Sequence, residues 1–134
     1  MTGIGTVGKA SVVVNQNLLA PVMKTGTVNV LSTAILSALM EEASCKALDN
    51  ANISNGKASV GCEIDLKHKR PSALNAHVEA ISKLTDVNKH GLFFDIEAYD
   101  ETGLVGTAKH RRVFVDKSSF ERKCEEAARK AQRH

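Results

Sequence analysis

Two different spacings of hydrophobic residues divide this chain of 134 residues into a first and a second half. Residues 6–14, "TVGKASVVV", predict a β-strand that the chain enters through glycines. Residues 33–49 contain neither glycine nor proline, and Ser32 or Thr33 can cap their first turn, so this segment predicts a long α-helix. The intervening residues 15–31, which include one proline and one glycine, predict a loop.

The second half of the chain predicts strands, because the hydrophobic period falls from about 3.6 residues to about two. Four strands are expected, at residues 58–68, 75–90, 91–100 and 104–116, and they are separated by short turns. In the first of these strands, alternate residues fall on one face, which is expected to be the half-buried face. That face consists of Ala58, Val60, Cys62, Ile64, Leu66 and His68.

A final helix is expected after the last strand. Ser118 and Glu121 have the spacing of a capping box, in which the two residues satisfy each other's backbone N–H groups. One face of this helix carries an apolar stripe, formed by Phe120, Cys124, Ala127, Ala128 and Ala131.

The order of these elements predicts an α+β fold. Strands that follow one another through short turns pair in an antiparallel sheet. The long early helix is apolar on most of its faces, so it must be buried against that sheet. An antiparallel sheet wrapped around one central helix, here with an added C-terminal helix, is the hotdog fold. Because the chain is short and contains no repeat or low-complexity linker, we expect one such domain over residues 1–134.

Composition and charge argue against several classes of function. The net charge of +3, with four Phe, one Tyr and no Trp, offers neither the charge nor the stacking surface typical of nucleic-acid binding. No apolar run approaches the roughly 18 residues that span a membrane, and no secretory signal is evident. Cys45, Cys62 and Cys124 are widely spaced and odd in number, which favours free thiols and a cytoplasmic location. No cluster of ligand residues suggests a metal or redox cofactor.

A glycine-rich segment near the N-terminus, "GIGTVGK" at residues 3–9, matches GxGxxG and nearly matches a P-loop. Both motifs need a preceding strand and a following helix, so that a phosphate can lie at the helix N-terminus. Here a strand follows and almost no chain precedes. The glycines are therefore expected to give a flexible entry to the first strand.

Two adjacent glutamates in the middle of the long helix have different expected environments. Glu42 lies one turn before Lys46, in the order that favours a solvated ion pair. Glu41 lies on a face of small residues, where a partner helix or a substrate can approach; alternatively it lies at a helix edge and reaches water. His68 is likewise either a site residue or an ordinary, partly buried histidine. Gly61, in mid-strand, indicates a bend, a bulge or a close approach of the backbone to another group.

Three segments together resemble a known family: "TAILSALMEEA" (33–43), "GCEIDLKHKRP" (61–71) and "GTAKHRRVFVDKSSFERK" (106–123). Their order and spacing resemble those of hotdog-fold acyl-CoA thioesterases of the fluoroacetyl-CoA thioesterase type, over most of the chain. The resemblance implies a catalytic set and two further residues that stabilise the oxyanion or bind substrate. The catalytic set falls on Thr33, Glu41 and His68, and the further residues fall on Gly61 and Arg112.

The resemblance also implies what this site would do. It implies hydrolysis of the thioester of an acyl-CoA without a cofactor, in a homodimer or a larger homo-oligomer whose sites lie at the dimer interface. The segment that covers the substrate in the fluoroacetyl enzyme has no clear counterpart in residues 15–31, so selectivity for fluoroacetyl-CoA is not predicted.

Two other classes of hotdog protein are alternatives. The first is a protein that binds acyl-CoA without cleaving it, as a sensor or carrier; such a protein would not need Thr33, Glu41 and His68 together. The second is a hydratase or dehydratase, and the chain carries no motif of that class.

Overall fold

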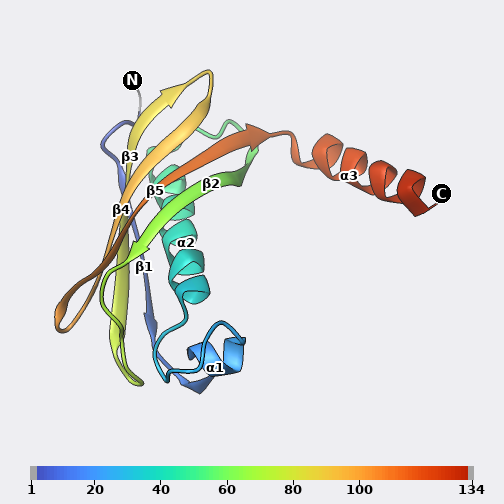
Figure 1. The fold of residues 1–134 in the computed structure, drawn as a ribbon. Coiled ribbons are helices and arrows are strands. Elements are labelled where there is room, and N and C mark those ends of the chain that lie inside the picture. The colour runs from blue at the N-terminus through green and yellow to red at the C-terminus, as the bar shows by residue number, and fades with distance from the viewer. Residues whose placement is uncertain (1–2, 133–134) are drawn as a thin grey trace.

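The computed structural model describes residues 3–132, in which a five-stranded sheet curves around one long helix (Figure 1). The elements, in chain order, are β1 (Val7–Val13), the 3₁₀ turn η1 (Gln16–Leu18), α1 (Ala20–Met23), α2 (Thr33–Ala51), β2 (Ala58–His68), β3 (His77–Asn88), β4 (Gly91–Asp100), β5 (Gly103–Val115) and α3 (Lys117–Gln132). The expected long helix, the four strands after it and the C-terminal helix are confirmed, with bounds that differ by at most two residues. Only β3, β4 and β5 form a meander, because β2 pairs with β5 and not with the next strand along the chain.

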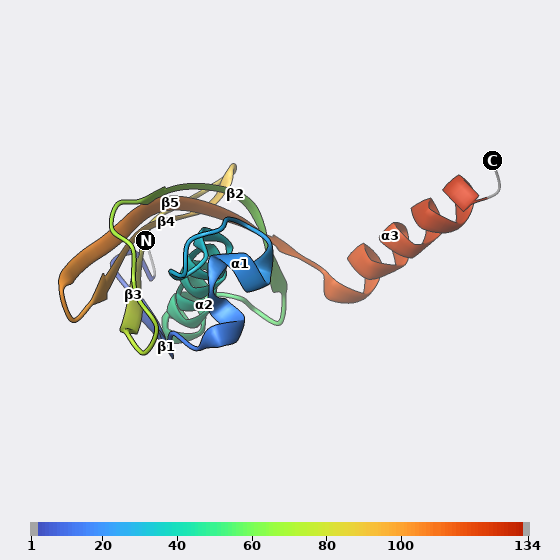
Figure 2. The ribbon, with the colours of Figure 1, turned by 60° about the horizontal axis from the view of Figure 1, so that its bottom comes forward.

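The sheet is antiparallel throughout, and its strand order is β1-β3-β4-β5-β2. Helix α2 lies inside the curve of this sheet, as Figure 2 shows when the molecule is viewed from its lower end. The core forms between α2 and the inner face of the sheet, and Leu36, Met40, Leu84, Phe94 and Ile96 are among its fully buried side chains. The sheet wrapped around one central helix is therefore confirmed.

The close contact between β1 and α2 sets the rotation of the helix. A Cβ atom built on Gly8 would lie 2.1 Å from the backbone nitrogen of Ala47 and 2.3 Å from the carbonyl oxygen of Ala43. The backbones of strand and helix therefore touch, which explains the small residues on this face of α2. Glu41 precedes Ala43 by two residues, or about 200° around the helix, and so it points away from β1.

A bulge in β2 changes which residues face the helix. The pairing of β2 with β5 shifts register between Gly61 and Glu63 and leaves Cys62 as the extra residue. Before the bulge, the inward positions are Ser59 and Gly61. After it, they are Ile64, Leu66 and His68. Our expectation that Ala58, Val60 and Cys62 share the face of His68 was wrong, because one inserted residue reverses the alternation of side chains.

The same bulge brings two of the expected site residues onto one face. Gly61 and His68 are seven residues apart, so a regular strand would place them on opposite faces of the sheet. With Cys62 as the extra residue, both face α2. The glycine is close to the middle of the helix, and the histidine is close to its N-terminus.

Two local expectations differ from the structure. The loop expected over residues 15–31 contains the short helical turns η1 and α1. The capping box expected from Ser118 and Glu121 was wrong, because it requires a helix that begins at Ser119, and α3 begins two residues earlier, at Lys117. Glu121 instead accepts hydrogen bonds from the side chain of Lys117 at 3.1 Å.

Helix α3 projects away from the sheet, and none of its side chains is buried (Figures 1 and 2). It leaves the body of the protein beside the start of the edge strand β2, because Val115 at the end of β5 pairs with Ala58. Within residues 3–132, no helix has the length and the apolar character that crossing a membrane requires.

Candidate active site

The N-terminus of α2 and the end of β2 meet in a hydrogen-bonded pair. Ser32 caps the helix, since its Oγ accepts the N–H of Ala34 at 3.2 Å. This cap makes Thr33 the first helical residue, and its Oγ1 lies 2.7 Å from Nδ1 of His68. Burial lowers the pKa of His68 below its ordinary value of 6.5, and the backbone of Arg70 acts in the opposite direction. The other ring nitrogen, Nε2, is buried and makes no hydrogen bond within the described residues.

The chain that follows His68 is fastened to the turn between β4 and β5. Lys69 and Arg70 both donate their backbone N–H groups to the carbonyl oxygen of Val105. The guanidinium of Arg70 donates to the carbonyl oxygen and the hydroxyl of Thr102. These bonds hold the end of β2 in place, and with it the ring of His68.

A second group of site residues surrounds Glu41, about two helical turns further along α2. A Cβ atom on Gly61 would lie 3.0 Å from Oε1 of Glu41, so the missing side chain lets the carboxylate lie directly against the backbone of β2. The same oxygen lies 3.5 Å from Nη1 of Arg112. The Glu41 side chain is 42% exposed, whereas that of Arg112 is 8% exposed. The carboxylate is therefore partly exposed, and it lies beside a buried cation and the exposed backbone of Gly61.

Arg112 is held mainly by two residues that the sequence analysis did not place in the site. Its Nε donates to Oγ of Ser59 at 2.9 Å, and its Nη2 donates to the Ser59 carbonyl oxygen at 3.1 Å. Its Nη1 lies 3.2 Å from Nε2 of His110. On the other side of that ring, Nδ1 lies 2.7 Å from the carbonyl oxygen of Glu63.

The imidazole of His110 is buried beside the ring of Phe94, with 5.8 Å between ring centroids. This burial lowers the pKa of His110 below 6.5, and the nearby Arg112 acts in the same direction. The Glu63 carbonyl and Glu41 act in the opposite direction. The net direction favours a neutral ring at neutral pH.

The structure of one chain does not bring the expected catalytic set together. Thr33 and Glu41 are eight residues apart on α2, a rise of about 12 Å. His68 is paired with Thr33, and Gly61 and Arg112 are grouped with Glu41. The site residues therefore form two groups: a Thr33–His68 pair, and a Glu41 cluster of Glu41, Gly61, Arg112, Ser59 and His110.

A hollow of about 360 Å³ opens beside the Thr33–His68 pair. Its other walls come from the segment around α1 and from the residues after β2. They include Thr25, Thr27 and Val28, and the lining contains no Phe, Tyr or Trp. A small or medium aliphatic group is the kind of ligand that such a lining can accommodate.

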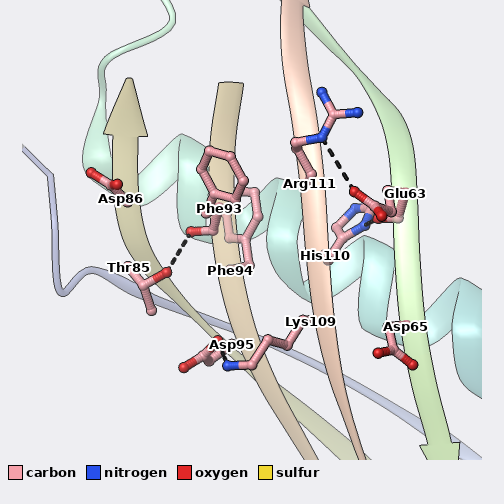
Figure 3. Close-up of a pocket in the computed structure, with 10 residues that line it drawn as sticks. All are labelled: Glu63, Asp65, Thr85, Asp86, Phe93, Phe94, Asp95, Lys109, His110 and Arg111. Atoms are coloured by element: carbon pink, nitrogen blue, oxygen red, sulfur yellow. Dashed lines mark hydrogen bonds and ion pairs between the residues drawn. The ribbon is translucent and has the colours of Figure 1, made fainter. Parts of the chain in front are cut away.

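A different hollow, of about 460 Å³, lies on the outer face of the sheet, with α2 behind it (Figure 3). Ion pairs span the strands there: Arg111 with Glu63 at 3.4 Å, and Lys109 with Asp95 at 2.8 Å. Thr33, Glu41 and His68 are not among its lining residues. Both lining cations are thus paired with carboxylates, as on a solvated sheet face, so we do not assign the site to this hollow.

The lowered pKa values of His68 and His110 predict a loss of stability on mild acidification. In each case the unfolded chain binds its proton at a higher pH than the folded chain does. The free energy of unfolding is therefore largest above about pH 6.5, and it should fall as the pH decreases through that value towards the folded pKa values. Urea unfolding between about pH 8 and pH 5 measures this dependence. A free energy that stays constant or rises on acidification would contradict it.

The architecture agrees with solved hotdog proteins of the thioesterase superfamily. A Thermus thermophilus protein of that superfamily superposes with a TM-score of 0.89, at 18% identity, over 100% of this chain and 98% of its own. The fluoroacetyl-CoA-specific thioesterase FlK gives a TM-score of 0.83 at 20% identity, over 92% and 95%. A hotdog-like protein from Thermanaerovibrio acidaminovorans gives 0.81 at 22% identity, over 92% and 91%. The fold is therefore the hotdog fold.

The family follows from the sequence comparison. The model of the fluoroacetyl-CoA-specific thioesterase family matches residues 14–118, which is most of the chain. The chain belongs to this family. No curated protein sequence matches it.

Sequence reasoning identified Glu41, Gly61 and Arg112 separately, and the structure places them side by side. It missed Ser59 because the regular alternation of β2 put that residue on the solvent face. His110 was not among the expected site residues either. It precedes Arg112 by two residues on the same strand, and residues two apart on a strand share a face, so its place beside Arg112 was predictable.

Proposed function

We propose that this protein is an acyl-CoA thioesterase that hydrolyses the thioester of a small or medium acyl-CoA through Thr33, Glu41 and His68. Membership of the thioesterase family supports the reaction class. The observation that carries the proposal is the Glu41 cluster. A partly exposed carboxylate lies against the exposed glycine Gly61, and the anchored guanidinium of Arg112 lies beside both.

Hydrolysis of a thioester needs a nucleophile, a group that stabilises the oxyanion and a proton for the leaving thiolate. Glu41 either deprotonates the attacking water or attacks the carbonyl itself to form a transient anhydride, which water then opens. The open side of Gly61 lets the thioester come close to backbone N–H groups that can bind the oxyanion. Arg112 adds positive charge on the same side. In the overall reaction the acyl–sulfur bond of the substrate breaks, an acyl–oxygen bond to water forms, and a carboxylic acid and a thiol are released.

The Thr33–His68 pair is placed in this proposal beside the sulfur of the leaving thiolate. Nδ1 of His68 is close to the Thr33 hydroxyl, and Nε2 is buried without a hydrogen-bond partner in the described residues. A buried nitrogen of this kind is a candidate donor or acceptor for a substrate atom, since unpaired buried polar atoms are costly. We assign Nε2 of His68 to a hydrogen bond with the leaving sulfur, and Thr33 to orientation of the ring. The thiolate receives the proton that the attacking water releases.

The distance between the two groups supports a dimeric site. Reacting groups must lie about 3–3.5 Å from the atoms they act on, and a rise of about 12 Å along α2 separates Thr33 from Glu41. A second copy placed against the free edge of β2 would run antiparallel to the first and could supply the Thr33–His68 pair to the Glu41 cluster of its partner. The proposed active form is thus at least a homodimer, with each site built from two chains.

Thiol release from a panel of acyl-CoAs, from acetyl to long-chain and aryl, tests the proposed function. The lining of the hollow beside Thr33 predicts the highest kcat/KM for a short or medium aliphatic acyl group. Tight binding of an acyl-CoA without any release of thiol would replace this proposal with the second candidate, an acyl-CoA sensor or carrier. A protein that neither binds nor cleaves any acyl-CoA of the panel would contradict both candidate functions.

A further inference from the structure

The guanidinium of Arg112 is anchored more firmly by its neighbours on the sheet than by Glu41. An arginine side chain has five N–H donors. Ser59 takes two of them, at 2.9 and 3.1 Å, and His110 takes a third at 3.2 Å. The contact with Glu41 is longer, at 3.5 Å, and the Glu41 side chain is exposed to a much greater extent. Arg112 therefore does not depend on Glu41 for its position.

The partners of His110 define the protonation state of its ring. The carbonyl oxygen of Glu63 can only accept, so Nδ1 of His110 must carry a proton. Arg112 can only donate, so Nε2 of His110 must be unprotonated. Both contacts are satisfied together only by the neutral ring with its proton on Nδ1.

We propose that Ser59 and His110 are positioning residues that hold the Arg112 guanidinium beside Glu41, and that His110 does so only as the neutral Nδ1–H tautomer. The functional part of this inference rests on the proposed thioesterase reaction. Since Arg112 is fixed independently, Glu41 can take a proton or form a covalent intermediate while the guanidinium stays in place. A preorganised charge of this kind costs no rearrangement during the reaction.

The surroundings of His110 explain why a second proton would release Arg112. The groups that face the ring are Arg112 on the same strand, Glu41 on α2, the Glu63 carbonyl on β2 and the ring of Phe94 on β4. Glu41 is the only one of these four groups that carries negative charge. A proton on Nε2 would remove the acceptor for Nη1 of Arg112 and would place two cations in contact. Turnover should consequently decrease as His110 becomes protonated.

Nuclear magnetic resonance of the full-length protein tests the anchoring without reference to turnover. Long-range ¹H–¹⁵N spectra at pH 7, with His110→Gln for assignment, should show a neutral Nδ1–H tautomer for His110. The Nε–H signal of Arg112 should exchange slowly, should persist in Glu41→Gln, and should lose its protection in Ser59→Ala. Exposed arginines such as Arg129 give the fast-exchange reference. An Nε2–H or doubly protonated His110 at pH 7, or loss of the Arg112 signal in Glu41→Gln, would overturn the proposal.

Steady-state turnover on the best acyl-CoA of the panel tests the catalytic consequence. Glutamine can place an acceptor oxygen near the position of Nε2, whereas leucine cannot. We expect kcat of His110→Leu to be at least about tenfold below that of His110→Gln, with similar KM values and similar melting temperatures. His77→Leu, at an exposed histidine, should retain the wild-type kcat. Equal kcat values for the two His110 variants would overturn the positioning role. A wild type that cleaves no acyl-CoA would instead refute the proposed function, and the tautomer and exchange results would still decide the anchoring.

Discussion

Replacement of Glu41 with alanine should lower kcat for acyl-CoA hydrolysis by about a hundredfold or more, because general acid–base catalysis typically contributes about 10²–10⁴-fold. Of the three side chains nearest to a Cβ atom built on Gly61, that of Glu41 carries the acidic group. Its removal leaves Arg112 anchored by Ser59 and His110, so the surrounding structure should persist. Free thiol release under saturating substrate measures the effect.

The neighbouring glutamate provides a matched control for this variant. Glu42 has a side chain that is 55% exposed and pairs with Lys46 on the helix surface at 3.3 Å. Glu42→Ala removes the same chemical group from the same helix and should leave kcat within about twofold of the wild type, since exposed i,i+4 pairs contribute little. If both variants lose activity equally, or if Glu41→Ala retains wild-type turnover, Glu41 is not the catalytic carboxylate.

Replacement of Gly61 with alanine should lower kcat by about tenfold, because a displacement of about 1 Å in a catalytic group costs about a hundredfold and the shift required here is smaller. The new methyl group would lie 3.0 Å from Oε1 of Glu41, 3.3 Å from Cε1 of His110 and 3.4 Å from Nη1 of Arg112. It would push the carboxylate aside and occupy the space through which the thioester approaches. Gly61 has no positive backbone φ, so alanine introduces no backbone strain at this position.

Comparison with a variant at the next residue separates this effect from general damage to β2. Cys62 is the extra residue of the bulge and is exposed, so Cys62→Ala should preserve both turnover and melting temperature. Gly61→Ala should have a melting temperature close to that of the wild type, with the loss confined to kcat and kcat/KM. Wild-type turnover in Gly61→Ala would contradict the placement of the thioester beside Glu41.

The sequence predicted much of the fold because local patterns and overall fold agree in this chain. Helix α2 contains no glycine or proline and begins at a serine cap, and the strands of the meander alternate between apolar and polar residues. The rotation of α2 was also predictable in part. The pairing of Glu42 with Lys46, expected from their helical spacing, is confirmed, and Glu41 lies instead beside Arg112. A catalytic role for Glu41 stays a prediction.

The bulge at Cys62 was not predictable from β2 alone. A bulge depends on how two strands pair, and in the sequence of β2 the residues around Cys62 continue a regular alternation. The inward face of β2 was consequently assigned wrongly before the bulge, and Ser59 was left out of the site. Gly61 was the one local signal, since glycine in mid-strand often accompanies a bulge or a close backbone approach.

The separation of the Thr33–His68 pair from the Glu41 cluster was not visible in the sequence either. The eight-residue spacing along α2 gives the distance, but whether it matters depends on where the substrate lies and on what a second copy contributes. This separation makes the central claim of the proposed function testable. Acyl-CoA hydrolysis should require one group of residues from each of two chains.

Co-expression of Glu41→Ala and His68→Ala chains, each with its own purification tag, tests that claim most directly. Each variant alone should be nearly inactive. A mixed dimer would contain one site with Thr33 and His68 from one chain and Glu41 from the other, and a second site that lacks both Glu41 and His68. Random pairing should therefore restore about a quarter of the wild-type rate of thiol release. The wild type must release thiol for this comparison to apply. If the co-expressed mixture is then no more active than the two variants alone, a site shared between chains is contradicted.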